Sequence, residues 1–163
     1  MNKSKTENKS ITSHLMAWWN ALQEPGKTAE RATLRRCKTV AEVVMTPAFQ
    51  RVCSNMSDEV KNDFDRERLA AVMGLLSHVR SKSSQPLAEQ MAGNPPVVSE
   101  LRFRRLLQRG RGELYIAMIR IIRMLNHQAD IFDLVNSVYY WGDSTKKRWA
   151  YTYFAKTPAK TSN

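Results

Sequence analysis

The amino-acid sequence predicts an all-α fold, organised as two packed small helical bundles joined by a loop. Apolar residues recur at spacings of three and four along most of the chain, and no segment alternates apolar and polar residues long enough to form a sheet. Ser, Pro and Gly instead gather in residues 81–98, which have no periodicity. A chain of 163 residues suits one domain or two small helical halves that share an interface.

The amino-terminal half is expected to span residues 10–80, after a disordered tail over residues 1–9. Its first helix has one apolar face and ends before Pro25 and Gly26, because both residues interrupt helices. That face carries Ile11, Leu15, Trp18, Trp19 and Leu22. A second helix is expected from about Thr28 to Cys37.

Capping signals mark the starts of the next helices. Thr39 with Glu42 is typical of a capping box, and Thr46 before Pro47 is typical of an N-cap with proline in the first turn. Ser57, followed by two acidic residues, predicts the start of a core helix. The buried stripe of that helix is Leu69, Val72, Met73, Leu76 and Val79.

The carboxy-terminal half is expected to span residues 99–157, after a linker loop over residues 81–98. Ser99 is the candidate cap of its first helix, and Gly110 and Gly112 are expected to break that helix. Three more helices should follow: a strongly apolar one over residues 113–126, one over residues 131–138 that ends near Gly142, and one that begins at Asp143 or Ser144 and runs through Phe154.

The charge balance points to a polyanionic partner. Lys and Arg number 26 against 15 Asp and Glu, which gives a formal charge of +11. Residues 1–80 carry 13 basic and 9 acidic groups, whereas residues 81–163 carry 13 and 6. The carboxy-terminal half should therefore dominate the electrostatic field. No apolar run approaches the ~20 residues of a membrane span, so we expect a soluble, intracellular protein.

Arginine clusters are the candidate phosphate contacts. Arg102, Arg105 and Arg109 share one sector of a helix, and few carboxylates lie four residues away to neutralise them. Arg120 and Arg123 occupy the polar strip of an otherwise apolar helix. The alternatives are a solvated helix face for the first group and, for the second, internal ion pairs with Glu113, Asp130 or Asp133.

Signs of catalysis, cofactors and metal binding are missing from the sequence. It has no glycine-rich phosphate loop, nucleophile elbow or metal-ligand spacing. Cys37 and Cys53 are expected to be small buried thiols, and His127 a polar rim residue. The aromatic residues near the carboxy terminus, such as Trp149 and Tyr153, suit core packing better than base stacking. We therefore expect a protein that is not an enzyme.

The order and spacing of several segments resemble the CasB family, the small subunit of the type I-E CRISPR surveillance complex Cascade. These segments are the Trp18 and Trp19 pair, LRRC at 34–37, TPAFQR at 46–51, LRFRRLLQ at 101–108, ELYIAMIRIIRML at 113–125, WGD at 141–143 and KKRWAYTYF at 146–154. The resemblance implies two helical bundles and a pair of copies inside a prokaryotic, cytoplasmic complex. It also implies that the chain meets guide RNA and the backbone and large subunits, and steadies the target and displaced DNA strands of an R-loop.

The resemblance implies that the basic residues on the family's strand-facing surface bind nucleic acid. With Arg109 from the cluster above, the candidates are Arg35, Arg36, Arg51, Arg102, Arg105, Arg109, Arg120, Arg123, Lys146, Lys147 and Arg148. Two other functions fit the same charge. One is a free-standing helical DNA-binding regulator that reads a duplex sequence, and the other is a basic scaffold that binds acidic proteins or anionic lipid.

Overall fold

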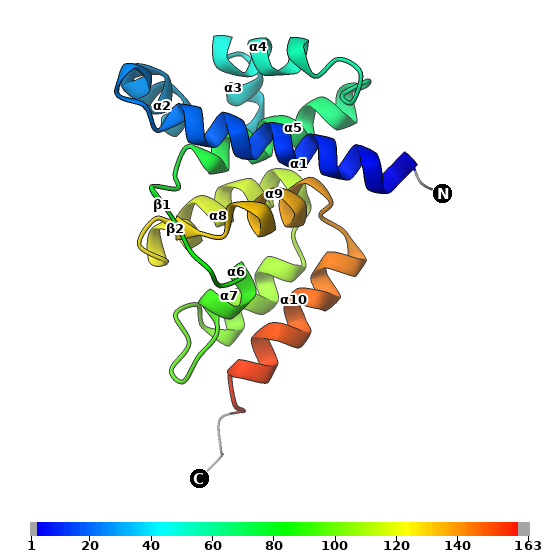
Figure 1. Cartoon of the computed structure of the whole chain (residues 1–163). Coiled ribbons are helices and arrows are strands. Elements are labelled where there is room, and N and C mark those ends of the chain that lie inside the picture. Colours follow the sequence, from blue (N-terminus) through cyan, green and yellow to red (C-terminus); the bar gives the residue numbers. More distant parts are fainter. Residues whose placement is uncertain (1–2, 160–163) are drawn as a thin grey trace.

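The computed structural model describes residues 3–159, and these residues form the all-α fold that the sequence predicts (Figure 1). Its elements are α1 (Lys3–Leu22), a 3-10 turn (Pro25–Lys27), α2 (Thr28–Arg35), α3 (Val40–Val44), α4 (Pro47–Asn55), α5 (Asp63–Leu76), β1 (Ser81–Lys82), α6 (Leu87–Met91), α7 (Glu100–Leu107), α8 (Arg111–Met124), β2 (Gln128–Ala129), α9 (Ile131–Tyr139) and α10 (Asp143–Lys156). Within this part of the chain, none of the helices has the length and apolar character to cross a membrane.

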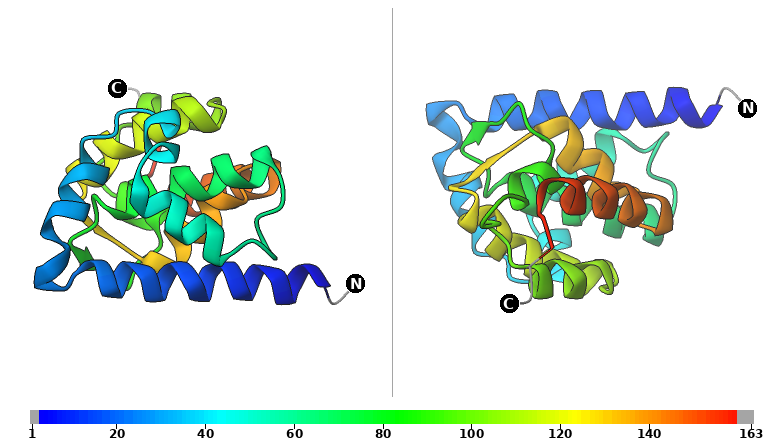
Figure 2. Two further views of the ribbon diagram at one scale, coloured as in Figure 1. Left: turned by 90° about the horizontal axis from the view of Figure 1, so that it is seen from above. Right: turned by 90° about the horizontal axis from the view of Figure 1, so that it is seen from below.

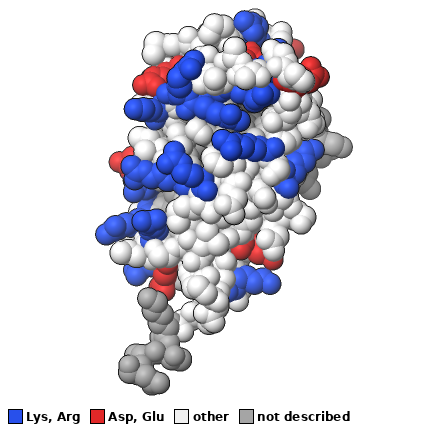
Figure 3. Space-filling model, turned by 90° about the vertical axis from the view of Figure 1, so that its left-hand side faces the viewer, with Lys and Arg blue, Asp and Glu red and all other residues white. Residues whose placement is uncertain are grey.

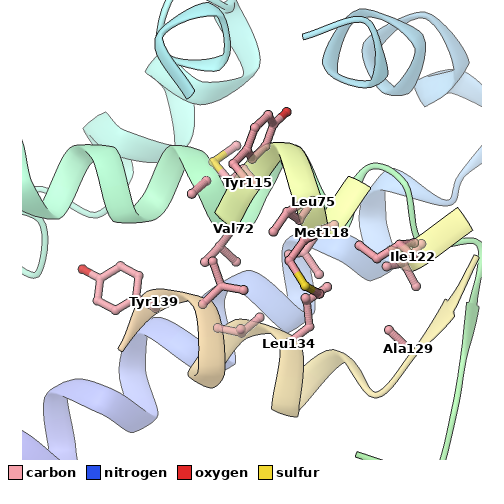
Figure 4. Close-up of a cluster of buried hydrophobic side chains, with 14 of the residues drawn as sticks. Val72, Leu75, Tyr115, Met118, Ile122, Ala129, Leu134 and Tyr139 are labelled. Atoms are coloured by element: carbon pink, nitrogen blue, oxygen red, sulfur yellow. The ribbon is translucent and has the colours of Figure 1, made fainter. Parts of the chain in front are cut away.

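Helix α5 lies at the centre of the fold, between α3 on one side and α8 and α9 on the other. Figure 4 shows side chains of α5, α8 and α9 meeting in one cluster, in which Val72, Met118 and Leu134 are fully buried. The cluster joins helices from both predicted halves, since α5 precedes residues 81–98 and α8 and α9 follow them. The core therefore continues across the predicted boundary.

Helix α1 runs along one side of the molecule and packs against α9 (Figure 2). The Thr12 hydroxyl donates to Oδ1 of Asn136 at 3.0 Å, across 124 residues of sequence. The indole of Trp19 donates to the Val79 carbonyl at 3.1 Å. These two contacts tie the first helix to α9 and to the segment that follows α5.

Helices α6, α7 and α10 form the lower part of the molecule in Figure 1. The rings of Phe103 on α7 and Tyr153 on α10 stack with centroids 3.9 Å apart. The Tyr153 hydroxyl donates to the Val98 carbonyl at 2.6 Å. Aromatic packing thus fixes α7, the arginine-bearing helix, against α10.

Three of the predicted caps are confirmed. The hydroxyls of Thr39, Thr46 and Ser99 accept from the backbone N–H three residues later, at 3.2, 3.2 and 3.3 Å. The predicted start at Ser57 is wrong, because α5 begins at Asp63. There Oδ1 of Asn62 accepts from the Asp65 N–H at 2.8 Å while the Asp65 carboxylate accepts from the Lys61 N–H at 3.1 Å.

Three other boundaries differ from the sequence prediction. Residues 81–98 are not wholly a loop, since α6 lies within them and buries Leu87, Ala88 and Met91 while it packs against α10. Helix α7 already ends at Leu107, Gly110 is the N-cap of α8, and Gly112 lies inside α8 rather than breaking a helix. Helix α1 begins at Lys3, inside the predicted tail, because no Pro or Gly interrupts the polar residues that precede Ile11. Residues 1–2 of that tail lie outside the described residues.

Candidate nucleic-acid interface

A groove between α7 and α8 brings together four of the predicted arginines. Its volume is about 260 Å³, and Arg102, Arg105, Arg109 and Arg120 contribute to its walls. The first three share one face of α7 and its end because they are spaced by three and four residues. Arg120 reaches the same groove from α8, so arginines from two successive helices line one groove.

The floor of this groove is apolar. Leu106 and Ile121 are almost fully buried there, whereas Ile116 keeps 45% of its surface exposed. The guanidinium of Arg102 also contacts the sulfur of Met124, at 3.6 Å. Arginine stems therefore lie on apolar surface while their charged ends remain exposed, an arrangement that suits a phosphate backbone.

Carboxylates leave most of the groove charge uncompensated. Arg109 is 3.9 Å from Glu113, whose side chain is 72% exposed. Within the described residues, no carboxylate lies within 4 Å of Arg102, Arg105 or Arg120. The alternative ion pairs of Arg120 and Arg123 with Glu113, Asp130 or Asp133 do not form in this part of the chain: Glu113 faces Arg109, Asp130 caps α9, and Asp133 accepts from the Leu87 N–H at 2.7 Å.

A second basic region lies on the side of the molecule that carries α2 and the β1–β2 pair. Figure 3 shows Lys and Arg side chains spread down this side, with the visible Asp and Glu side chains near its edges. Arg35 is half-buried, and its Nε donates to the Ser77 carbonyl at 2.6 Å. Burial, followed by the charges of Arg80 and Arg31, lowers the pKa of Arg35. Its neighbour Arg36 is exposed.

The remaining predicted residues lie elsewhere. Arg51, on α4, forms a 3.2 Å ion pair with Glu30 across a separate groove. Arg148 donates to the Ser137 hydroxyl at 3.0 Å, while Lys147 is exposed. These positions on α4 and α10 do not line the α7–α8 groove.

Lys146 is connected to the groove through Trp141. Its ammonium lies 5.7 Å from the centroid of the Trp141 ring. The indole N–H of Trp141 donates to the Arg109 carbonyl at 3.0 Å. Lys146 therefore lies closer to the α7–α8 groove than its place on α10 suggests.

Several basic residues that sequence reasoning missed, or grouped differently, now have defined places. Arg80 lies near Arg35, and Arg123 lies near His78. Arg104 lines a different groove, beside the 93–101 segment. Arg111 contacts the exposed Phe64 ring, at 4.9 Å from its centroid. The only sequence signal for Arg80 as a candidate is that it directly follows Val79, the last residue of the apolar stripe of the core helix.

The aromatic residues near the carboxy terminus and the cysteines mainly pack in the core. Trp149 and Tyr153 are buried, as the core-packing interpretation predicts, whereas Tyr151 is 80% exposed. Cys37 is buried and Cys53 partly buried; burial and Glu42 raise the pKa of the Cys37 thiol. Among the described residues, no three His, Cys, Asp or Glu side chains are grouped as a metal site.

Comparisons with known proteins match the sequence of this chain to a CRISPR-associated family and its fold to a chain of a CRISPR complex. The model of the family described as CRISPR-associated protein Cse2 matches residues 30–154. The fold is similar to that of a chain in the crystal structure of E. coli Cascade bound to a PAM-containing dsDNA target, with a TM-score of 0.72 and 20% sequence identity. That match covers 87% of this chain and 95% of the E. coli chain. No curated protein sequence matches significantly.

Proposed function

Because the chain belongs to the family of the CRISPR-associated protein Cse2, we propose that it is the non-catalytic small subunit of a type I-E Cascade complex and holds R-loop DNA by its phosphate backbone. The α7–α8 groove carries this proposal. It joins four arginines over an apolar floor, and only one of them has a carboxylate within 4 Å among the described residues. Such a surface neutralises phosphates without reading base edges.

The DNA strands of an R-loop are suitable ligands for this groove. Guide RNA reads the target by base pairing, so the protein needs only to restrain strands whose exchange is energetically near-balanced. A few added phosphate contacts on the target strand or the displaced strand then lengthen the life of the open state. The proposed partners are guide RNA, both DNA strands, the backbone and large subunits, and a second copy of this chain, in the cytoplasm of a prokaryote.

The test is the lifetime of the R-loop in a reconstituted complex. Replacing the four groove arginines, Arg102, Arg105, Arg109 and Arg120, by Ala should shorten it at least tenfold, since each lost charged contact is worth about 1 kcal/mol or more. The control, Arg104→Ala combined with Arg66→Ala, removes two charges outside the groove, and the double variant Arg102→Ala with Arg120→Ala removes two charges inside it. An unchanged R-loop lifetime in a complex that still incorporates the fourfold variant would reject this surface.

The two alternatives give different binding results. A free-standing regulator requires direct base contacts and should prefer one duplex sequence, so equal affinity for unrelated duplexes excludes it. A scaffold for acidic proteins or anionic lipid should give no gel shift with single-stranded DNA at low salt. The Cascade proposal expects a gel shift with little dependence on sequence.

A further inference from the structure

Phosphate binding does not explain the floor of the α7–α8 groove. Among the described residues, those that line the groove besides its four arginines all carry apolar side chains. They are Leu106, Ile116, Ala117, Ile121 and Met124. None of these side chains carries a hydrogen-bond donor, so a phosphodiester laid on the floor would lose water without gaining a partner from it. The floor therefore suits a different part of a nucleotide.

One side of α8 forms most of this floor. Ile116, Arg120 and Met124 follow one another at intervals of four residues, so their side chains lie along the same side of the helix. Ala117 lines the groove beside Ile116 and is half-buried. Because the side chain of Ala117 is a single methyl group, it leaves space in the groove that a longer apolar side chain would fill.

The size and the charge of the groove together favour a nucleotide as its occupant. Its volume of about 260 Å³ is slightly below the roughly 300–1,000 Å³ of clefts that take drug-sized molecules, so it suits a group the size of one ring system. The arginines around the apolar floor require negative charge close to that ring. A nucleic-acid strand meets both conditions, because each of its bases has a phosphate on either side.

Arg102 bridges the two walls of the groove. Its side chain starts on α7, and its Nη1 atom lies 3.6 Å from Sδ of Met124 on α8. A guanidinium group is planar, and its face stacks on the unpaired bases of single strands. Arg102 can therefore cover one face of a base whose other face lies on Ile116 and Ala117.

We propose that the α7–α8 groove takes up one unpaired base of a DNA strand, while its arginines bind the phosphates on either side of that base. This inference rests on the proposed function, because the R-loop supplies the strand. A duplex keeps its bases stacked and paired, so it cannot place one in the groove without breaking a pair. The groove therefore selects an unpaired strand, such as the displaced strand of the R-loop, but its apolar floor does not read which base is present.

Filling the groove tests the proposal without altering its charge. Ala117→Leu adds an apolar side chain inside the groove, and Ala17→Leu adds the same side chain at an exposed position of α1 as the matched control. Leu suits a helix nearly as well as Ala, so both variants should keep the fold, which circular dichroism checks. The binding probes are oligo(dT), an oligonucleotide of equal length without bases, and a duplex.

We expect Ala117→Leu to weaken oligo(dT) binding about fivefold or more, because stacking contacts to one base are worth at least this much. Binding of the strand without bases and of the duplex should change less than twofold. The salt dependence of oligo(dT) binding should keep its slope, since no phosphate contact is lost. Equal affinity of the unsubstituted chain for the strands with and without bases, or an equal loss on all three probes in Ala117→Leu, overturns the proposal.

A photochemical measurement locates the base directly. Oligo(dT) with one 5-iodouracil base is irradiated with the full chain, and mass spectrometry identifies the cross-linked peptide. We expect attachment to α8 near Met124, and its loss in Ala117→Leu. Cross-links confined to peptides outside α7 and α8 reject the site. So does an Ala117→Leu chain that binds oligo(dT) normally but no longer joins the reconstituted complex, because the groove would then hold a protein partner. In each case the R-loop lifetimes of the arginine variants still decide the proposed function separately.

Discussion

Gly74 is the residue at which α5 makes its closest approach to α3 and α8. A Cβ at this position would lie 2.6 Å from the Tyr115 hydroxyl and 2.9 Å from a Val43 methyl. The Tyr115 ring has no room to withdraw, because it is fully buried and its hydroxyl donates to the Cys37 carbonyl at 2.8 Å. The absent side chain is therefore what allows three helices to meet.

We expect Gly74→Ala to lower the free energy of unfolding by about 1–3 kcal/mol, through overpacking. Urea unfolding monitored by circular dichroism measures this change. Gly112→Ala is the matched control, since Gly112 is also helical and a Cβ there meets nothing within 4 Å. That control should be neutral or up to ~1 kcal/mol more stable, and an equal loss in both variants contradicts the explanation.

The protonation of His78 should couple stability to pH in the absence of DNA. Its pKa lies near 4 in the folded chain and near 6.5 when unfolded, so the unfolded chain binds the proton first as the pH falls. The free energy of unfolding should fall as the pH drops from 6.5 toward 4, by about 2–3 kcal/mol or less, because solvent screens the partly exposed ring. Urea midpoints measured at several pH values should show this decline, and His78→Gln should reduce its slope. A parallel decline in the variant would assign it to other groups.

At the scale of elements, helix starts are set by side chains that accept backbone N–H groups. Thr46 is the most buried example, since its hydroxyl accepts from the Phe49 N–H and also donates to the Val43 carbonyl at 2.7 Å. One residue thus ends α3 and begins α4. The pair of bonds explains why two short helices can follow each other without a loop.

Replacing Thr46 by Ala should cost about 1–2 kcal/mol, because both bonds are lost in a buried place. Thermal or urea unfolding measures the loss. Thr28→Ala removes an exposed hydroxyl that donates to the Pro25 carbonyl and serves as the control, with an expected change below ~0.5 kcal/mol. A Thr46 variant as stable as this control would show that the cap is dispensable.

Elements were predictable from sequence where a local signal decides them. Thr39, Thr46 and Ser99 each act within three residues of their own position, and the structure uses all three as caps. Ser57 carries the same signal, but Val60 turns into the core and Asn62 forms the cap instead. Helix α6 escaped prediction because five residues are too few to show a period, and its packing against α10 stabilises it.

At the scale of the whole molecule, the site depends on contacts that sequence spacing does not reveal. The spacing of Arg102 and Arg105 was enough to predict a shared face. By contrast, Arg51 pairs with Glu30, and Arg148 lies 3.9 Å from Asp133, partners that are distant in sequence. The roles of all these arginines in binding nucleic acid stay predictions. The structure shows which arginines form ion pairs, such as Arg51 and Arg148, and which groove arginines have no carboxylate within 4 Å among the described residues.

The unpaired arginines should make binding steeply dependent on salt. The logarithm of the affinity for single-stranded DNA falls linearly with the logarithm of salt concentration, by about 0.7 per phosphate contact. Replacing Arg102, Arg105 and Arg120 by Ala should therefore reduce the slope by about 2. Fluorescence anisotropy across a salt series measures it, with Arg104→Ala as the control on the same helix. A slope unchanged by the triple replacement would show that these side chains do not touch phosphates.

The packing of α1 on α9 has a consequence for how the chain is made. During synthesis α1 emerges from the ribosome before α9, since Asn136, which accepts from Thr12, follows 124 residues later. At roughly 5–20 residues per second, that interval is about 6–25 s. During this interval the apolar face of α1, which includes Ile11 and Leu15, is not covered by α9. The packing of α1 is thus deferred until α9 has been synthesised, and the apolar face of the nascent helix stays exposed until then.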